Sequence, residues 1–486
     1  MKKVVCLLLS LVFILSFCAC NGTEQSEPVT KQQFTQYITG NLTENDITAQ
    51  VDEKANALLD TIIGLDDTVC AKPGCSTYYL SNNGDDTNSG TSPDEPIATV
   101  DKLNSLDLSY GDCVLFNRGD TFRSANVKMT TGVSYGAYGT GDKPKLYGSP
   151  QNFKDAKWLN SNIPNVYILR YRFTGDVGAI IFNDAEEIAN KVDSMDKLKE
   201  NIQFYFDSAT CLTYVYCDKG CPADVYDSIE VNTAGHIFSM KSGNKCTDIT
   251  IENICLMYTG YHGIGVGAAT NLNIRGCIVG YIGGSIQPGM LPSGTRFGNG
   301  IEVWGACDGY YIDHCYVYQC YDSGITMQYG GEEDIPVYEK NIKFTNNLLE
   351  YSHSNIEYWM NNKSDDSAIQ NVEISGNICR KSGYGWSYNT RPSRNNGCLI
   401  VGGLKGIQKN RTENFVVSDN IFDRARAYLF HLGADKDEWI PQFINNTYIL
   451  HSDSRFINYQ DKNYGSGKSD EAAKLIKDTN PTIYIV

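Results

Sequence analysis

Three look-alike segments decide the fold: G-N-G-I-E-V-W (298–304), Y-D-S-G-I-T-M-Q (321–328) and H-S-N-I-E-Y-W (353–359). An isoleucine recurs at the same point of each segment. Because side chains alternate along a strand, one face carries Ile301, Val303, Ile325, Met327, Ile356 and Tyr358. The other face carries Glu302, Trp304, Thr326, Gln328, Glu357 and Trp359. The pattern predicts one strand repeated in successive coils, with acids and indoles on its outer face.

A second repeat starts near Ile249 and has the form aliphatic, two residues, Asn or Cys, one residue, aliphatic. Its anchor residues are Asn253, Cys277, Cys315, Asn347, Asn377, Asn420 and Asn446. The shortest separations approximate one solenoid coil, and the longer ones indicate coils with inserted loops. Asparagines stacked in a tight turn can form hydrogen bonds from coil to coil. We therefore interpret this ladder, including its cysteines, as architecture.

The amino terminus has the features of an export signal. Lys2 and Lys3 precede an apolar run too short to span a membrane, and Ala19-Cys20 resembles a cleavage site followed by a lipid-attachment cysteine. An ordinary secretory signal is the alternative. We expect a signal peptide at 1–19, a lipid-anchored polar tether at 20–75 with a short helix around Asp52–Leu59, and display outside the cytoplasmic membrane, or secretion. The membrane would be contacted through this anchor only.

Charge and cysteine content restrict the partners. Removal of residues 1–19 deletes two lysines and no acid, so the formal net charge changes from −16 to −18. Nucleic acid is therefore not expected as a partner, and a directly bound anionic polysaccharide is disfavoured. Cys70 with Cys75, and pairs among Cys211, Cys217 and Cys221, are disulfide candidates. No C-x-x-C occurs beside histidines, so zinc is not expected. We assign no metal site and no cofactor, and we expect a monomer.

The rest of the chain divides into segments that differ in their residue patterns. Residues 76–149 contain a turn-rich run, Y-Y-L-S-N-N-G-D-D-T-N-S-G-T-S-P from Tyr78, typical of a cap with first coils. Residues 150–231 alternate short strands with a plausible helix at Ser194–Asn201, which indicates a small α+β insertion. Repeats fill 232–460, and 461–486 form a C-terminal segment.

The turn-rich run resembles the N-terminal cap of secreted right-handed parallel β-helix proteins that act on polysaccharides. The three central segments resemble those of β-helical glycoside hydrolases, nearest the fucosidase and xylanase family numbered 141. The resemblance covers roughly residues 76–460. It implies an all-β, pectate-lyase-like right-handed parallel β-helix and cleavage of plant cell-wall glycans by two carboxylic acids. The resemblance implies that the family's two catalytic acids correspond to Asp322 and Glu357 in this sequence.

The candidate site follows from the repeated strands. Glu302 and Glu357 are predicted two coils apart, with backbones about 9.5 Å apart, and Asp322 lies at the corner of the intervening coil. A wide carboxyl pair suits an inverting glycosidase, whereas a close pair suits a retaining one. The candidate catalytic residues are Glu302, Asp322 and Glu357. The candidate substrate-binding residues are Asn299, Trp304, Gln328, His353, Trp359, Trp386 and Arg391, with His262 also bordering this face.

We expect an extracellular glycoside hydrolase acting on a polysaccharide or oligosaccharide of plant or host origin. One alternative is a non-catalytic glycan-binding or adhesive surface protein. Another is a polysaccharide lyase, which the absence of Lys and Arg from the three central strands disfavours. Product analysis separates these classes, because a lyase makes unsaturated ends and a hydrolase makes reducing ends.

Overall fold

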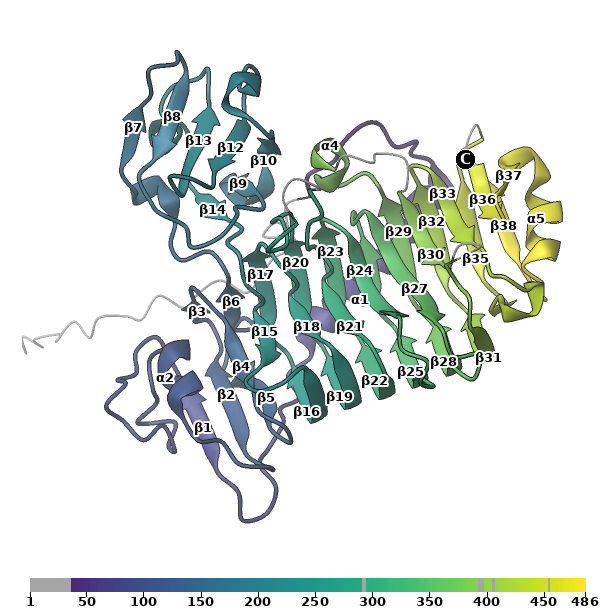
Figure 1. The fold of residues 1–486 in the computed structure, drawn as a ribbon, viewed down its shortest axis with the longest axis horizontal. Helices are drawn as coiled ribbons and strands as arrows, with labels where there is room; N and C mark the ends of the chain where they lie inside the picture. Colours follow the sequence, from purple (N-terminus) through teal and green to yellow (C-terminus); the bar gives the residue numbers. More distant parts are fainter. Residues whose placement is uncertain (1–35, 291–293, 392–396, 404–406, 453–454) are drawn as a thin grey trace, which may run out of the picture.

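The computed structural model describes residues 36–486 except 291–293, 392–396, 404–406 and 453–454. The predicted signal peptide and lipid-attachment Cys20 lie outside the described residues. The fold is a right-handed parallel β-helix, as predicted, built from three ten-stranded sheets (Figure 1). No helix within the described part of the chain is both long and apolar enough to span a membrane.

The strands of each sheet stack in chain order. Sheet A contains β1 (Thr77–Leu80), β2 (Cys113–Asn117), β5 (Ser134–Tyr138), β16 (Lys245–Glu252), β19 (Ala268–Arg275), β22 (Cys307–Asp313), β25 (Tyr338–Thr345), β28 (Ala368–Ser375), β31 (Arg411–Ser418) and β34 (Gln442–Ile444). Sheet B contains β3 (Thr121–Phe122), β6 (Lys145–Tyr147), β17 (Cys255–Thr259), β20 (Ile278–Ile282), β23 (Tyr316–Cys320), β26 (Leu348–Glu350), β29 (Ile378–Ser382), β32 (Ile421–Ala425), β35 (Thr447–Leu450) and β38 (Thr482–Ile485).

Sheet C carries the three central segments. It contains β4 (Val127–Met129), β15 (Phe238–Met240), β18 (Ile264–Val266), β21 (Ile301–Trp304), β24 (Ser323–Gly331), β27 (Ser354–Asn362), β30 (Cys398–Gly402), β33 (Tyr428–Leu432), β36 (Arg455–Tyr459) and β37 (Lys462–Gly465). Ile301 pairs with Ile325, and Ile325 with Ile356. All three are fully buried in the main core, so the predicted inward stack is confirmed.

The asparagine ladder is also confirmed, at the turn between sheets A and B. The backbone N–H of Asn347 donates to Oδ1 of Asn377 at 2.9 Å, and the N–H of Asn377 donates to Oδ1 of Asn420 at 2.9 Å. Cysteines replace asparagine in earlier coils: Cys277 Sγ lies 3.6 Å from the Ile251 carbonyl oxygen, and Cys315 Sγ makes an equivalent contact. The thiol thus takes the place of the amide donor.

The ends and the insertion complete the molecule. Residues 158–216 form a five-stranded sheet of β7 (Trp158–Asn160), β8 (Val166–Leu169), β11 (Asn190–Lys191), β12 (Gln203–Asp207) and β13 (Leu212–Tyr216), beside β9 (Ile180–Phe182), β10 (Glu187–Ile188) and β14 (Ile229–Val231). This unit has its own apolar cluster and stands to one side of the solenoid (Figure 1). Helix α2 (Val100–Ser105) lies against β4 at the N-terminal end, and α5 (Ser469–Leu475) contacts β36 at the other end.

Three short predictions need correction. The helix expected at Ser194–Asn201 is a single 3₁₀ turn, Met195–Lys197; α3 (Pro222–Val225) is the short α-helix of the insertion. All 14 described cysteines are free thiols, so neither proposed disulfide group is bridged. The polar tether predicted for residues 20–75 is wrong for its described part, because residues 46–64 form a helix that packs on the solenoid.

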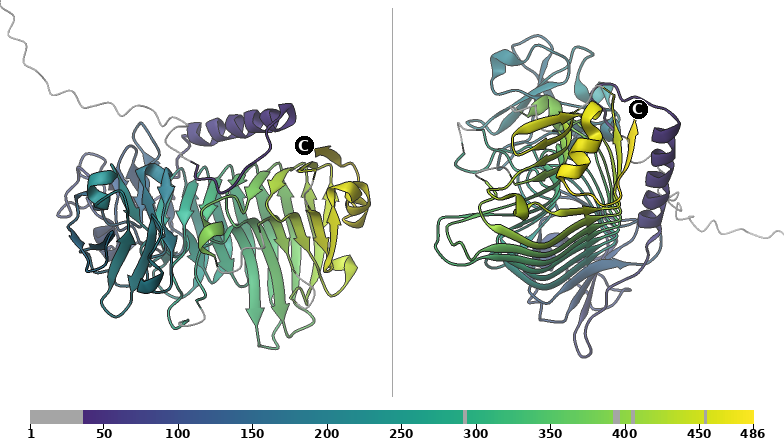
Figure 2. Two further views of the ribbon diagram at one scale, coloured as in Figure 1. Left: turned by 90° about the horizontal axis from the view of Figure 1, so that it is seen from above. Right: turned by 90° about the vertical axis from the view of Figure 1, so that its right-hand side faces the viewer.

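That helix, α1 (Asp46–Gly64), lies along the outside of the solenoid (Figure 2). Its buried positions, Thr48, Val51, Ala55, Leu59 and Ile62, recur at helical spacing and form one stripe. Ala55, Leu59 and Ile62 pack in a cluster with tyrosines of sheet B, including Tyr258, Tyr281 and Tyr318. The polar residues that suggested a tether occupy the remaining surface of an amphipathic helix.

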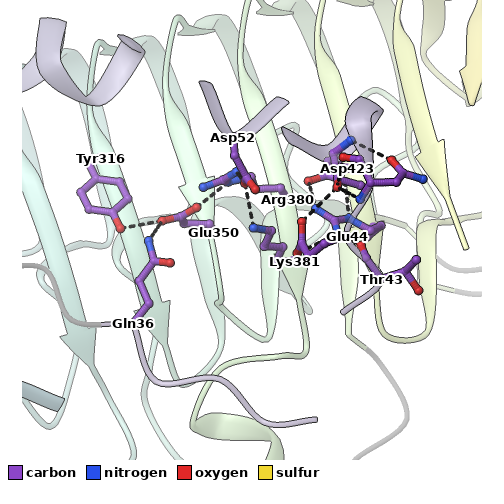
Figure 3. A network of polar contacts seen from close by, with 12 residues as sticks. Gln36, Thr43, Glu44, Asp52, Tyr316, Glu350, Arg380, Lys381 and Asp423 are labelled. Atoms are coloured by element: carbon purple, nitrogen blue, oxygen red, sulfur yellow. Dashed lines mark hydrogen bonds and ion pairs between the residues drawn. The ribbon is translucent and has the colours of Figure 1, made fainter. Parts of the chain in front are cut away.

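Buried ion pairs also hold α1 in place (Figure 3). Arg380 of β29 pairs with Asp52 of the helix and with Glu350 of β26, where Nε and Oε2 are 2.5 Å apart. Glu350 also accepts hydrogen bonds from the Tyr316 hydroxyl and the Gln36 amide, both at 2.6 Å. The segment before α1 is therefore joined to sheet B by charge as well as by apolar contact.

Candidate functional site

The outer face of sheet C aligns the predicted site residues in two rows. Strand pairing places Glu302 beside Thr326, and Thr326 beside Glu357. The second row is Trp304, Gln328 and Trp359, in the same coils. Neighbouring strands lie about 4.8 Å apart, so the backbones of the two glutamates are about 9.5 Å apart. The shared face and the two-coil offset of the glutamates therefore follow the predicted alternation.

Glu302 is enclosed by hydrogen-bond donors. Its Oε2 accepts from the side-chain amide of Asn299 and, at 3.5 Å, from that of Gln328. Asn299 is fixed in this orientation because its Oδ1 accepts from the Ser323 backbone N–H at 3.0 Å. The carboxyl is 9% exposed. The side-chain amides of Asn299 and Gln328, both predicted to bind substrate, thus hold the Glu302 carboxyl in the described structure.

His262 supplies a third donor to Glu302, and its tautomer follows from the backbone. Nδ1 of His262 accepts a hydrogen bond from the Asn299 N–H at 3.0 Å, so the ring proton lies on Nε2. Nε2 is 3.2 Å from Oε1 of Glu302. Burial lowers the pKa of His262 to about 4, so the neutral ring donates to Glu302 near neutral pH.

Asp322 lies at the corner before β24 and is paired with a cation. Its Oδ1 is 2.8 Å from Nη1 of Arg391, which follows the short helix α4 (Ser387–Thr390). Arg391 also donates to the Tyr321 carbonyl oxygen at 3.2 Å. Both Arg391 and Arg296 lie over the ring of Tyr321, each at 5.4 Å from its centroid. A loop of a later coil thus brings a positive charge to the acid cluster.

Glu357 is held from the neighbouring coil. Its Oε2 accepts a hydrogen bond from the Ser323 hydroxyl at 2.7 Å. Ser323 follows Asp322 directly, and its backbone N–H is the group that orients Asn299. The corner at 322–323 therefore connects all three candidate acids.

The three carboxyl groups differ in acidity. Burial raises the pKa of Glu302 to about 7, and the charge of Asp322 adds to this effect. Burial and Asp322 also raise the pKa of Glu357 to about 7. Burial would raise the pKa of Asp322 too, but Arg391 outweighs it and holds that pKa below its ordinary value. Near neutral pH the site therefore combines one ionised carboxylate with two glutamates close to their midpoints.

His353 occupies the position of Asp322 in the next coil, since Ser323 pairs with Ser354. It is buried, and its Nδ1 has no hydrogen-bond partner among the described residues. Burial, with Arg391 nearby, lowers the pKa of His353 to about 3. A neutral ring is therefore expected next to the Asp322–Arg391 pair.

The indoles divide into two groups. Trp304 is 43% exposed and meets Trp359 edge to face, with ring centroids 5.4 Å apart. Trp386, a predicted substrate-binding residue, is instead buried at 1% exposure, and its Nε1 donates to the Gln319 carbonyl oxygen at 2.8 Å. The prediction for Trp386 is wrong, because the loop folds its indole under Tyr321 rather than toward solvent.

A cavity of about 420 Å³ adjoins Glu302 on the side of the earlier coils. Its lining comprises His236, Ser239, Met240, Gly243, Asn244, His262, Gly265, Val266, Gly267, Phe297, Glu302 and Trp304. Among the described residues, no group of three or more His, Cys, Asp or Glu side chains is placed to hold a metal.

His236 and Ser323 were not among the predicted site residues, although the repeat contains a signal for both. His236, His262, Asn299 and Ser323 each stand two positions before a paired core residue of sheet C. The strand register thus defines a column of polar residues beside the acid row.

No protein-family model matches this chain. A lacto-N-biosidase of Bifidobacterium longum subsp. longum is 34% identical over 101 residues, which are 19% of this chain and 6% of that protein. The chain thus matches only a small part of that relative's length.

Two solved structures are similar in architecture. A xylose complex of XylC has a TM-score of 0.49 at 13% identity, covering 78% of this chain and 69% of that chain. A GH136 lacto-N-biosidase from Eubacterium ramulus has a TM-score of 0.38 at 13% identity, covering 85% and 68%. The fold assignment rests on the strand pairing of this chain itself, and the resemblance to family 141 stays a prediction.

Proposed function

We propose that this protein is a carbohydrate-active enzyme that hydrolyses a glycosidic bond. The observation that carries the proposal is the geometry of three neighbouring carboxyl groups: Arg391 pairs with Asp322, whereas Glu302 and Glu357 accept hydrogen bonds from neutral side chains. Glycoside hydrolysis needs a carboxylic acid that protonates the departing oxygen and a carboxylate that attacks the sugar or activates water. Asp322, paired with Arg391, suits the carboxylate. Glu302 or Glu357, each with a pKa of about 7, suits the acid.

The surroundings of the acids support a sugar substrate. The exposed face of Trp304 and the adjoining Trp359 offer apolar surface on which a sugar ring can stack. The partial match to a lacto-N-biosidase is consistent with this class of activity. In the proposed reaction the bond between the anomeric carbon and the departing oxygen breaks, the acid supplies the proton, and water supplies the new hydroxyl.

A glycan panel tests the proposal. Wild type, Glu302→Gln, Asp322→Asn and Glu357→Gln are assayed on xylans, fucosylated glycans and lacto-N-biose-containing oligosaccharides, with release of reducing ends as the readout. We expect wild type to release products and Asp322→Asn to be inactive. Near-wild-type rates in all three variants would exclude this site. Binding without any cleavage by wild type would favour the adhesive alternative.

A polysaccharide lyase is the second candidate, because the structure brings Arg391 to the centre of the site. The central strands carry no basic residue, but this loop arginine lies 2.8 Å from Asp322. A lyase needs a group that neutralises a uronate together with a base, and Arg391 could take the first role only by leaving Asp322. Ultraviolet absorbance of unsaturated product ends separates the two reactions in the same assay.

We also propose export and lipid attachment at Cys20, supported by Lys2, Lys3 and the Ala19-Cys20 pair. Membrane fractionation of wild type and Cys20→Ala tests this location. A variant that still fractionates with membranes would exclude lipidation at this residue.

A further inference from the structure

The cavity beside Glu302 extends away from Asp322 and Glu357. Most of its lining comes from the coils before β21. Glu302 is the residue that belongs to both: it lines the cavity and accepts hydrogen bonds from Asn299 and His262. Asp322 and Glu357 lie on the side of the later coils, beyond β21. If one sugar unit of a substrate fills the cavity, the glycosidic bond that joins it to the next unit would lie beside Glu302. The rest of the substrate would lie over the later strands.

Gly265 creates the floor of this cavity. Strand pairing places it beside Glu302, in the same outward row. Its φ lies outside the left-handed region, so the backbone conformation does not require glycine here. A Cβ at this position would lie 2.9 Å from Nδ1 of His236 and 3.3 Å from Cβ of His262. The missing side chain therefore leaves space next to the two imidazoles.

The two imidazoles form one wall of the cavity. The rings of His236 and His262 stack at 5.2 Å with an interplanar angle of 14°. Nδ1 of His236 accepts from the His262 backbone N–H at 3.2 Å, which leaves Nε2 of a neutral ring as a donor. Phe297, which also lines the cavity, packs edge to face on His262 with ring centroids 5.0 Å apart and so fixes the orientation of this ring.

The remaining lining is uncharged apart from Glu302. Met240, Val266, Phe297 and Trp304 supply apolar surface, while Ser239 and Asn244 supply neutral hydrogen-bonding groups. Outside the lining, Lys128 donates to the Ser239 hydroxyl at 3.0 Å. Such a mixture of apolar walls and a few neutral polar groups, in a volume of about 420 Å³, is typical of a small-ligand site. The one lining carboxyl would repel a like charge.

We propose that this cavity is a subsite for a neutral sugar unit of the substrate, with Gly265 and Ser239 providing its space. The inference rests on the proposed hydrolysis. It adds that the sugar unit bound next to Glu302 is uncharged. The sugar packs against Trp304 and the imidazole wall, and its hydroxyls bind His236 and Asn244. A uronic acid in the same place would put its carboxylate near Glu302.

Binding is measured by titration calorimetry, which does not depend on catalysis. The ligands are xylose, galactose, fucose and glucose, with glucuronate as the charged counterpart of glucose. The proteins are wild type, Ser239→Leu, which adds apolar volume to the lining, Gly265→Ala, and Gly467→Ala as a remote control. A Cβ at Gly467 meets no atom within 4 Å. Thermal melts check that each variant is folded.

We expect at least one neutral sugar to bind wild type and Gly467→Ala equally, and Ser239→Leu and Gly265→Ala about tenfold or more weakly, because the added side-chain atoms occupy space that the sugar needs. Unchanged binding in a folded Ser239→Leu, tighter binding of glucuronate than of glucose, or no binding of any neutral sugar would overturn the subsite. If the sugars bind as expected but no glycan is cleaved, the subsite stands and the hydrolase fails. If glycans are cleaved with an unchanged KM by Ser239→Leu, the hydrolase stands and the subsite fails.

Discussion

The rate of glycan cleavage is expected to fall as pH rises through about 7, because the proposed acid is Glu302 or Glu357, each with a pKa raised to about 7 by burial. Only the protonated form can donate to the departing oxygen. Above the pKa the protonated fraction falls about tenfold per pH unit, so kcat/KM at pH 9 should be about tenfold below its value at pH 8. Asp322 stays ionised throughout, because Arg391 keeps its pKa low.

Glutamine variants identify which glutamate is the acid. Glutamine cannot donate the proton, so replacing the acid should lower kcat/KM by about 10² to 10⁴ and remove the alkaline fall. Replacing the other glutamate should leave that fall in place. A nitrophenyl glycoside has a leaving group that needs no proton, so the acid variant should regain activity on it, whereas Asp322→Asn should not.

The assay is kcat/KM from pH 5 to 9 for wild type, Glu302→Gln and Glu357→Gln. Glu373→Gln serves as the control, because Glu373 lies on β28 of sheet A and pairs with Lys343 at 2.8 Å. Thermal melts at each pH separate a change in catalysis from unfolding. An alkaline fall of equal size and midpoint in both site variants would refute the reasoning, because neither glutamate would then be the titrating acid.

Three further predictions concern charges that burial makes costly. Arg391→Gln should raise the pKa of Asp322 and so shift the acidic limb of the kcat/KM profile to higher pH. Arg391→Lys should give an intermediate shift. An acidic limb that is unchanged in Arg391→Gln would contradict the role of this ion pair. Glu339 is fully buried on β25 with both oxygens lacking hydrogen bonds among the described residues, and burial raises its pKa well above the ordinary value. The fold favours the neutral form of Glu339, so stability is lost as pH rises above the unfolded-state pKa. Glu339→Met should therefore raise the melting temperature more at pH 8 than at pH 4. A smaller gain at pH 8 would contradict a raised pKa for Glu339. Glu350→Gln leaves Arg380 with the partly exposed Asp52 as its remaining carboxylate partner. It should therefore cost up to about 3 to 5 kcal/mol in urea unfolding, a result that an unchanged midpoint would contradict.

The sequence predicted the repeating parts of the fold because each repeat obeys a local rule. Alternation places Ile301, Ile325 and Ile356 inward, and strand pairing keeps them in register. The same rule fixed the faces of Glu302 and Glu357. These residues could be placed from sequence because the strand geometry that orients them is the same in every coil.

Residues outside the strands could not be placed in this way. Trp386 and Arg391 lie five positions apart in one inserted loop, yet Trp386 is buried under Tyr321 while Arg391 reaches Asp322. Neither outcome follows from local spacing, because the path of the loop is set by what it packs against. The docking of α1 was missed for a related reason: Asp52 gains its partner Arg380 from more than 300 residues later in the chain.

The position of Asp322 shows how the solenoid can give neighbouring acids different properties. Residues in one row of a strand are repeated at fixed spacing and share similar surroundings, as Glu302 and Glu357 do in having pKa values of about 7. Asp322 stands at a corner instead, where inserted loops from other coils can reach it. One such loop supplies Arg391 and holds this carboxyl ionised. The regular strand thus provides the spacing between acids, and the irregular loop provides the difference in charge that acid and base catalysis requires.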